Sequence, residues 1–254
     1  MKIMELALKG KVIILTGVTG GIGRQIALDF LLEGAIVIGL IRNENKMQKI
    51  RNWITEQNVS DKNLHSKVGD LLDYQGLQKV VREIVDEFHR VDVLVNCAGF
   101  AHENPFAILD QDQIDSMIDV NFKSPLYLSH AVLRPMFRQK EGCIINISSV
   151  SAIKKGRGVA VYAAAKAAMD AFTRALSSEV GRKNIRVNCI RPGVINTTMS
   201  GPLLERAHDI VNASTALSRF GYPNEISKAV LFIASNNTAS YMTGETFTID
   251  GGMF

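Results

Sequence analysis

The chain is poor in residues that crosslink, bind metals or span a membrane. Its three cysteines, Cys97, Cys143 and Cys189, are odd in number, and each lies within or at the end of an apolar, strand-like segment. No pair has metal-ligand spacing and the five histidines are scattered, so we expect buried thiols in a reducing cytoplasm and no metal site. No apolar run approaches the ~20 residues that span a bilayer, and Val12–Leu15 is too short for a signal-peptide core.

Charge and composition exclude further classes of protein. The 254 residues carry 29 Lys and Arg against 25 Asp and Glu, a net charge of +4, and only six prolines. No basic cluster interleaved with aromatic residues is present, so we expect no nucleic-acid partner. A hydrophobic content of 46% is that of a soluble globular protein with a substantial core.

Strand-like apolar runs alternate with helical periodicity along the whole chain, without a linker or a short repeat. This alternation predicts one doubly wound α/β domain over residues 1–254, a Rossmann fold with a seven-stranded parallel sheet flanked by helices. The strands are expected at Val12–Thr16, Ala35–Ile41, Leu64–Gly69, Val91–Asn96, Cys143–Ser148, Ile185–Arg191 and Thr246–Asp250. The helices are expected at Ile22–Glu33, Lys46–Gln57, Tyr74–Phe88, Gln111–Arg138, Tyr162–Val180, Pro202–Asn212 and Asn224–Ser235.

A tyrosine and a lysine four residues apart, Tyr162 and Lys166, form the most informative pair in the chain. On a helix they share one face, and a nearby ammonium would lower the tyrosine pKa from its usual value of about 10. Ser149 upstream could hold a substrate oxygen while Tyr162 gives or takes its proton, which suits alcohol–carbonyl interconversion. Taken alone, the spacing could also be a chance pair on an ordinary helix.

A glycine-rich turn follows the first expected strand, in the stretch from Thr16 to Gly23. Gly17, Gly21 and Gly23 permit positive φ and let the backbone approach a pyrophosphate at the N-terminus of the next helix. The spacing is Gly-x-x-x-Gly-x-Gly rather than the commoner Gly-x-Gly-x-x-Gly. A glycine turn without a ligand is the alternative.

Together these motifs resemble the short-chain dehydrogenase/reductase family, whose motifs are Thr-Gly-x-x-x-Gly-x-Gly and Tyr-x-x-x-Lys, in order along essentially the whole chain. The resemblance implies a catalytic tetrad of Asn121, Ser149, Tyr162 and Lys166. In it Tyr162 exchanges the proton, Lys166 lowers its pKa and holds the nicotinamide ribose, and Asn121 kinks its helix and holds a water of a proton relay.

The same resemblance implies a set of cofactor-binding residues. Asp70 would meet the adenine, Asn96 would steady the sheet and line the ribose, and Ile195 and Thr197 would meet the nicotinamide carboxamide. Cys97 departs from the family's second asparagine at this motif. The full set is Gly17, Thr19, Gly21, Ile22, Gly23, Arg42, Asp70, Leu71, Asn96, Ala98, Gly99, Tyr162, Lys166, Pro192, Gly193, Ile195 and Thr197.

The end of the second expected strand indicates which nicotinamide cofactor is used. Ile41 stands where an acidic residue would select NAD, and Arg42 follows it, which favours the 2′-phosphate of NADP(H). Gly20 lies where NADP-preferring relatives often carry a second basic residue, and Arg42 could also be a solvated surface arginine. NADP(H) implies ketone reduction rather than alcohol oxidation as the physiological direction.

A short lid between Thr197 and Arg219, together with the end of the chain, resembles bacterial 3-oxoacyl-(acyl-carrier-protein) reductases. Arg134 matches an arginine that meets the acidic carrier protein in that family, whereas Ser178 replaces a second one. Another β-keto thioester, a polyketide, a sugar or a small ketone stays open as substrate. So do a polyol or hydroxysteroid dehydrogenase that uses NAD and, outside enzymes, an NADP-sensing regulatory protein, although Tyr162 and Lys166 are both intact.

The family resemblance also implies a cytoplasmic homotetramer. The helix expected at Tyr162–Val180 is rich in alanine, so it can pack closely against the sheet on one side and a partner helix on another. The C-terminus is apolar to Phe254, and contact between subunits is the simplest way to bury it.

Overall fold

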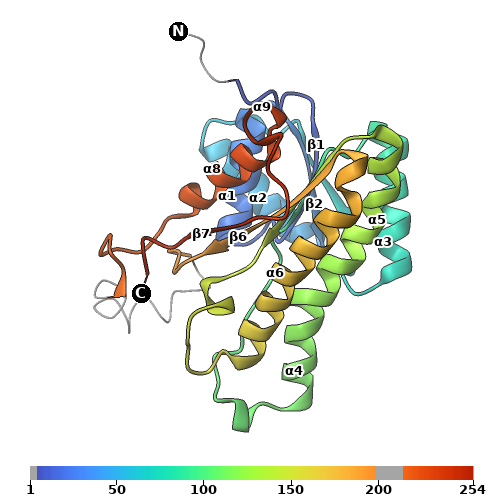
Figure 1. The fold of residues 1–254 in the computed structure, drawn as a ribbon. Helices are drawn as coiled ribbons and strands as arrows, with labels where there is room; N and C mark the ends of the chain where they lie inside the picture. Colours follow the sequence, from blue (N-terminus) through green and yellow to red (C-terminus); the bar gives the residue numbers. More distant parts are fainter. Residues whose placement is uncertain (1–4, 198–213, 254) are drawn as a thin grey trace.

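The computed structural model describes residues 5–197 and 214–253. They form one seven-stranded parallel sheet with the strand order β3-β2-β1-β4-β5-β6-β7 (Figure 1). The strands are β1 Val12–Thr16, β2 Ile36–Ile41, β3 Leu64–Val68, β4 Val93–Asn96, β5 Gly142–Ile147, β6 Ile185–Pro192 and β7 Thr246–Ile249. The predicted fold class is confirmed, and every predicted strand is present with small shifts at its ends.

The central strands form where the sequence has continuous apolar runs. β1, with the sequence Val-Ile-Ile-Leu-Thr, is buried along its whole length, as a parallel strand covered on both faces must be. The order of the strands reverses direction between β1 and β4, so the chain leaves these two neighbours toward opposite sides of the sheet. In such folds a crevice for ligands opens at the carboxyl ends of the strands at this point.

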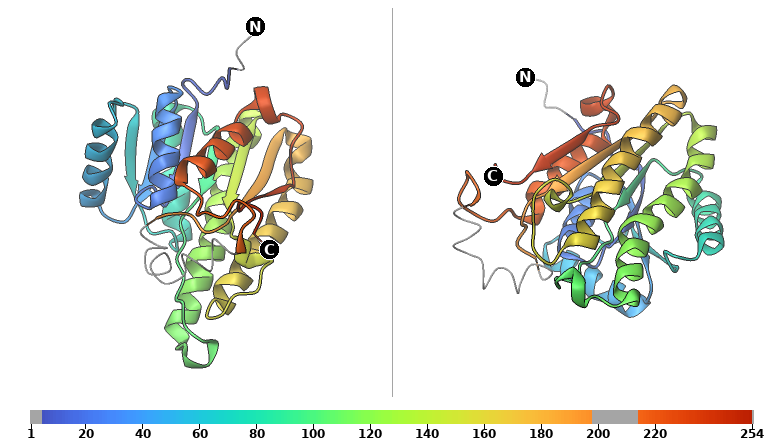
Figure 2. Two further views of the ribbon diagram at one scale, coloured as in Figure 1. Left: turned by 90° about the vertical axis from the view of Figure 1, so that its left-hand side faces the viewer. Right: turned by 60° about the horizontal axis from the view of Figure 1, so that its bottom comes forward.

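Helices cover both faces of the sheet (Figures 1 and 2). One face packs against α1, α2 and α8, and the other packs against α3, α5 and α6. The α-helices are α1 Gly21–Leu32, α2 Glu44–Glu56, α3 Tyr74–Phe88, α4 Gln111–Ile118, α5 Ser124–Gln139, α6 Ala160–Val180, α8 Pro223–Ala234 and α9 Asn236–Ala239. None of the helices in residues 5–197 and 214–253 is both long enough and apolar enough to cross a bilayer.

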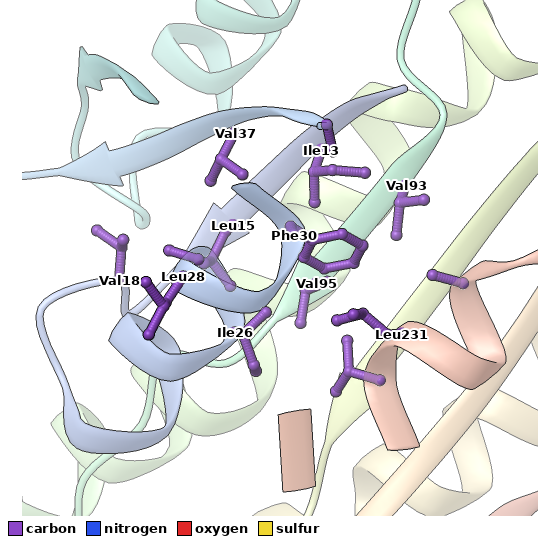
Figure 3. Packing of buried hydrophobic residues seen from close by; sticks show 14 of the residues in the cluster. Ile13, Leu15, Val18, Ile26, Leu28, Phe30, Val37, Val93, Val95 and Leu231 are labelled. Carbon is purple, nitrogen blue, oxygen red and sulfur yellow. The ribbon is translucent and has the colours of Figure 1, made fainter. Parts of the chain in front are cut away.

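The core beneath α1 is built from interlocking aliphatic side chains around one phenylalanine. Phe30 of α1 has no exposed surface and lies over β1 and β4, close to Ile13 and Val93 (Figure 3). Leu231 of α8 belongs to the same cluster and lies at its edge. Because α1 begins at the glycine turn, this packing fixes where the turn sits above the sheet.

Local sequence signals set several helix ends. Asp73 accepts a hydrogen bond from the amide of Gly76 at the start of α3, and Asp110 forms a reciprocal capping box with Gln113 at the start of α4. At the other ends, His89 and Lys140 adopt left-handed conformations that terminate α3 and α5.

One predicted helix is divided in the structure, and another lies outside the described residues. The predicted helix Gln111–Arg138 is divided into α4 and α5 by a π-helical segment, η2, at Asp119–Lys123. The sequence period of 3.6 does not show such an insertion, because one extra residue changes the pattern only locally. The predicted helix Pro202–Asn212, with most of the expected lid, lies outside the described residues.

We expect Phe30→Ala to lower the free energy of unfolding by about 3–5 kcal/mol, because it leaves a cavity that the packed sheet cannot close. Urea unfolding followed by circular dichroism measures the change. Leu32→Ala, two residues along the same helix at a side chain that is 62% exposed, is the matched control and should cost less than about 1 kcal/mol. Similar losses in the two variants would contradict the assigned core.

Candidate active site

A cavity of about 940 Å³ opens at the carboxyl ends of the strands, across the point where the strand order reverses. Its lining comes from the β1–α1 turn, the ends of β2, β4, β5 and β6, and the first turns of α6. A cavity of this size and position can enclose a dinucleotide with a small substrate beside it.

The glycine turn approaches its neighbours so closely that side chains are excluded. Gly17 has a φ of 69°, and a Cβ there would lie 2.8 Å from the amide nitrogen of Ala98. A Cβ on Gly23 would lie 2.1 Å from the carbonyl oxygen of Gly17. The N-cap of α1, Gly20, makes no side-chain hydrogen bond, so the first amides of the helix are available to an anion.

The turn is tied to the end of β4 by one hydroxyl. Thr16 Oγ1 accepts hydrogen bonds from the amides of Cys97 and Ala98, each at 3.0 Å. Both residues line the cavity, and burial raises the pKa of the Cys97 thiol to about 12. Cys97 is therefore a neutral thiol in the cavity wall at physiological pH.

A chain of buried amides and hydroxyls runs beneath the cavity from β4 to α6. Asn96 Nδ2 donates to Asn146 Oδ1 at 2.8 Å, and Asn146 Nδ2 donates to Thr173 Oγ1 at 2.9 Å. Asn96 also donates to Ser129 Oγ of α5. All four side chains are buried, so their hydrogen bonds fix α6 at one height relative to β4 and β5.

Tyr162 and Ser149 lie together in the cavity wall, as the sequence predicts. Burial raises the pKa of Tyr162, and a hydrogen bond with Ser149 partly offsets this rise. The lowering expected from Lys166 does not outweigh burial in the chain by itself: the ammonium lies 5.7 Å from the centre of the phenol ring, and desolvation of the phenolate dominates the pKa. At neutral pH Tyr162 is thus a phenol, the form that can donate a proton.

Lys166 is a buried cation. Its side chain is 4% exposed, its Nζ donates to the carbonyl oxygen of Ile147 at 2.8 Å, and its own backbone carbonyl accepts from Ser148 Oγ at 3.0 Å. Burial lowers the pKa of Lys166 to about 8. The ammonium faces the cavity, and a Cβ on Gly99 would lie 3.2 Å from it.

Asn121 lies in the π-helical segment, which agrees with the expected distortion of its helix. Its Nδ2 donates to the carbonyl oxygens of Phe100 and Met117, and its Oδ1 accepts from the amide of Phe100 at 3.3 Å. A Cβ on Gly99 would lie 2.6 Å from this Oδ1. Asn121 is fully buried and does not line the cavity, so it holds the loop after β4 beside Lys166.

An ion pair that sequence reasoning missed lies one helical turn beyond Lys166. Asp170 Oδ2 is 2.8 Å from Arg191 Nε, and Asp170 Oδ1 accepts from the Cys189 thiol at 3.4 Å. Asp170 is buried, and its charge raises the pKa of Lys166 against the larger effect of burial. The signal in the sequence was an acidic residue four positions after the lysine, on an otherwise alanine-rich helix.

Two cations line the far end of the cavity. Arg42 follows β2, and Lys46 lies in the first turn of α2. No ion pair within residues 5–197 and 214–253 involves either side chain. Lys46 was missed from the sequence, although a basic residue four positions after Arg42 and just inside a helix is a usable signal.

Most predicted cofactor residues line this one cavity, and two do not. Asp70 is exposed and accepts a hydrogen bond from the amide of Leu72, and it does not line the cavity, so its contact with the adenine stays a prediction. Asn96 is buried in the amide chain and cannot line a ribose. The predicted residues that do line the cavity are Gly17, Thr19, Gly21, Ile22, Gly23, Arg42, Leu71, Ala98, Gly99, Ser149, Tyr162, Lys166, Pro192, Gly193, Ile195 and Thr197.

The cavity fits a nicotinamide dinucleotide. The cradle of Gly17, Gly21 and Gly23 excludes side chains where a pyrophosphate must approach the backbone. The rest of the cavity extends from Arg42 to Lys166, and the phenol of Tyr162 lies beside Lys166. No cluster of acidic, histidine or cysteine side chains in the described part of the chain could hold a metal ion.

A family model described as enoyl-(acyl carrier protein) reductase matches residues 17–254. The chain belongs to the short-chain dehydrogenase/reductase family, and it is an oxidoreductase that acts on CH–OH groups with a nicotinamide cofactor. Among curated proteins it is 35% identical to 3-oxoacyl-[acyl-carrier-protein] reductase FabG of Thermotoga maritima, over 98% of this chain and 99% of that protein. It is 37% identical to the FabG of Escherichia coli, over 97% and 98%.

Solved structures agree with this assignment. The structure of gox2181 superposes with a TM-score of 0.91 at 30% identity, over 98% of this chain and 97% of the other. A structure described as that of an NAD(P)-dependent gluconate 5-dehydrogenase from Beutenbergia cavernae, with bound NADP, gives 0.88 at 32% identity, over 98% of each chain.

Replacing Lys166 by methionine should stabilise the fold in a pH-dependent way. Burial lowers the pKa from its usual 10.5 to about 8, so between these values the unfolded chain binds the proton that the folded chain releases. Stability of the wild type therefore rises with pH across this window. The advantage of Lys166→Met should be largest below pH 8 and shrink by about 3 kcal/mol by pH 10.5.

Urea unfolding from pH 7 to pH 10.5 measures this difference. Lys79→Met, at a lysine that is 73% exposed on α3, is the control, and its effect should not vary with pH. A constant difference between Lys166→Met and the wild type across the window would show that Lys166 is not desolvated.

Proposed function

We propose that this protein is an NADPH-dependent ketoreductase that reduces a β-keto (3-oxoacyl) thioester or a similar ketone to the hydroxy product. The observation that carries the proposal is the arrangement of one cavity. The half-buried phenol of Tyr162 and the Ser149 hydroxyl line the same wall beside the buried Lys166, and the cavity continues to the unpaired cation Arg42. The roles of the individual residues are proposals that this arrangement supports.

In the proposed reduction, Ser149 donates a hydrogen bond to the substrate carbonyl oxygen while Tyr162 transfers its phenolic proton to the same oxygen. The cofactor, when bound, supplies hydride directly to the carbonyl carbon. Lys166 faces the developing phenolate and stabilises it, and its ammonium can hold the nicotinamide ribose. Asn121 keeps the loop after β4 against Lys166, and in the proposed mechanism it holds a water that links Lys166 to solvent as a proton relay.

The raised pKa of Tyr162 supports reduction as the physiological direction. A phenol that is neutral at pH 7 is ready to donate its proton, whereas oxidation needs the phenolate as base. The use of NADPH would also favour reduction. The cations Arg42 and Lys46 support NADPH as the cofactor, because they line the end of the cavity where a 2′-phosphate would lie.

The substrate class rests on the curated relatives, which are named 3-oxoacyl-[acyl-carrier-protein] reductases. NADPH-oxidation kinetics against acetoacetyl-CoA, an acyl-carrier-protein β-ketoester and a panel of simple ketones test it. A kcat/KM for the thioesters at least tenfold above that for the simple ketones is the expected result. Faster turnover of simple ketones would remove the thioester from the proposal.

A polyol or sugar dehydrogenase is the second candidate, because one solved relative is described as a gluconate 5-dehydrogenase. Gluconate with NADP and NAD therefore belongs in the panel. A non-catalytic NADP-sensing role has less support, since Ser149, Tyr162 and Lys166 are all present in one cavity.

We further propose that residues 1–254 act as one domain in the cytoplasm and that an acyl carrier protein docks at Arg134. This arginine is exposed on α5, and no ion pair within the described ranges involves it. Ser178 stands at the position of the family's second docking arginine and provides no charge there, and its hydroxyl donates to the carbonyl of Arg174 on α6.

The homotetramer is also a proposal. Ala164, Ala168, Ala171 and Ala175 recur at helical spacing on the outward side of α6, where a partner helix could approach closely. The apolar C-terminus is a weaker argument than the sequence suggested, because Met253 pairs with Thr215 of the same chain. Phe254 lies outside the described residues.

Tyr162→Phe should lower kcat by about 10²–10⁴-fold, because only the proton donor is removed. The Kd for NADPH, measured by fluorescence titration, should stay within about twofold. Tyr241→Phe, which removes a hydroxyl from a fully exposed ring, is the control and should leave kcat unchanged. Retention of more than about a tenth of kcat in Tyr162→Phe would remove this residue from the mechanism.

Arg42→Asp should shift the ratio of kcat/KM for NADPH over NADH toward NADH by about 10- to 100-fold. The substitution removes a charge-assisted partner of the 2′-phosphate and adds a repulsive carboxylate. Arg82→Asp makes the same charge change at an exposed position of α3, away from the cavity, and should not alter the ratio. An unchanged ratio in Arg42→Asp would show that Arg42 points elsewhere.

Light scattering at micromolar concentration should give about four times the 27.9 kDa mass of the chain. Ala168→Arg, which places a large charged side chain on the outward face of α6, should dissociate the assembly. A stable and active monomeric wild type would overturn the proposed tetramer.

A further inference from the structure

Three cations occupy one short connection beside the cavity. Between η3, Val150–Ala152, and α6, the chain carries Lys154, Lys155 and Arg157 within four residues. Lys155 and Arg157 are exposed and Lys154 is half-buried. No hydrogen bond or ion pair from any of the three side chains occurs within the described part of the chain.

The connection lies at the substrate end of the cavity. The residues that bracket it, Ser151 and Val159, both line the cavity, together with Ser149 and Tyr162. A Cβ on Gly158 would lie 3.3 Å from the backbone of Glu103, another residue that lines the cavity, so the connection packs directly against the cavity wall. Figures 1 and 2 show the connection at the same end of the sheet as α4.

Chain length limits how far these cations can be from the reacting groups. Lys155 follows Ser149 by six residues, so their backbones are at most about 20 Å apart. Arg157 precedes Tyr162 by five residues, which gives a limit of about 17 Å. A substrate that binds its ketone at Tyr162 and carries an anionic group on a long arm can therefore reach this connection.

The cofactor does not account for these charges. A bound dinucleotide would place its pyrophosphate at the β1–α1 turn and its adenosine end near Arg42, on the other side of the cavity from the connection. Glu103 is the acidic side chain of the cavity wall within the described residues. One carboxylate cannot balance three adjacent cations, whose summed potential favours an anion at this rim.

We propose that Lys154, Lys155 and Arg157 bind the phosphate of a phosphopantetheine arm, so that the enzyme recognises its thioester substrate by this phosphate as well as by its ketone. This inference rests on the proposed reduction of a β-keto thioester. The same phosphate occurs in a coenzyme A thioester and in an acyl carrier protein, so the site serves either source. Arg157 provides a planar fork of donors for phosphate oxygens, and the lysines add mobile charge.

The test uses two substrates that differ by one phosphate: acetoacetyl-pantetheine and acetoacetyl-4′-phosphopantetheine. We expect the wild-type protein to have a kcat/KM about tenfold higher for the phosphorylated substrate, with the difference in KM. Each exposed charge contact contributes a factor of about 1.4 to 5, so three contacts together give an effect of this size. The preference should fall as salt rises from 20 to 500 mM, because exposed charges are screened.

The triple variant Lys154→Ala, Lys155→Ala, Arg157→Ala should abolish the preference and leave kcat/KM for acetoacetyl-pantetheine within twofold of the wild type. The double variant Arg182→Ala, Lys183→Ala is the matched control. It removes two exposed cations at the far end of α6, about 30 Å from the first turn of that helix, and should retain the preference. Thermal unfolding of all variants checks that the fold is intact, and the charge reversal Lys155→Glu alone should lower the preference further than Lys155→Ala.

The outcomes separate this inference from the proposed function. Reduction of both substrates with no phosphate preference would overturn the phosphate site and leave the thioester reductase standing. Failure of the wild type to reduce either thioester would overturn both. Two further arms identify the source: an acetoacetyl-acyl carrier protein and acetoacetyl-CoA should both lose affinity in the triple variant. A loss confined to the carrier protein would show that the cations contact the protein surface instead, and would also overturn the proposal.

Discussion

The geometry of the site depends on the chain of buried hydrogen bonds from Asn96 through Asn146 to Thr173. These side chains are buried, so a shift of α6 against β4 and β5 that broke one of these bonds would leave its donor or acceptor unpaired and cost the desolvation of that group. Tyr162 and Lys166 lie on the same helix, about three and two turns before Thr173. Their height above the cavity floor is therefore set by polar contacts, while the apolar contacts of α6 only hold it against the sheet.

The burial of the Lys166 ammonium carries a free-energy penalty. Desolvation opposes its charge, and the fold offsets this only in part, through the carbonyl of Ile147 and the carboxylate of Asp170. Asp170 is held in turn by Arg191, at the end of β6 and next to the segment that begins with Pro192. The charge state of Lys166 is thus coupled to the position of the end of β6. Lys166 and Arg191 lie far apart along the chain, but through Asp170 they form one electrostatic unit.

The sequence was sufficient for the fold and for most of the cavity, because the signals involved are local. Continuous apolar runs such as Val12–Thr16 specify buried parallel strands. The spacing of Gly17, Gly21 and Gly23 specifies a turn whose backbone is open to a ligand because no side chain covers it. A motif gives a residue's position and not the direction of its side chain: here Asp70 accepts from the amide of Leu72, and Asn96 donates to Asn146 beneath the cavity. The pKa of Tyr162 depends on burial, which the Tyr-x-x-x-Lys spacing does not report.

The π-helical segment Asp119–Lys123 has a consequence for how this chain tolerates changes in length. A π turn contains one residue more than the α-turn that it replaces, so it is an insertion already accommodated within the helix. Deleting one residue there would leave a regular helix but would rotate α4 by about 100° relative to α5, since each residue turns an α-helix by that angle. Asn121 would then no longer face Phe100. A change that makes the helix more regular would therefore disconnect the loop after β4 from Lys166.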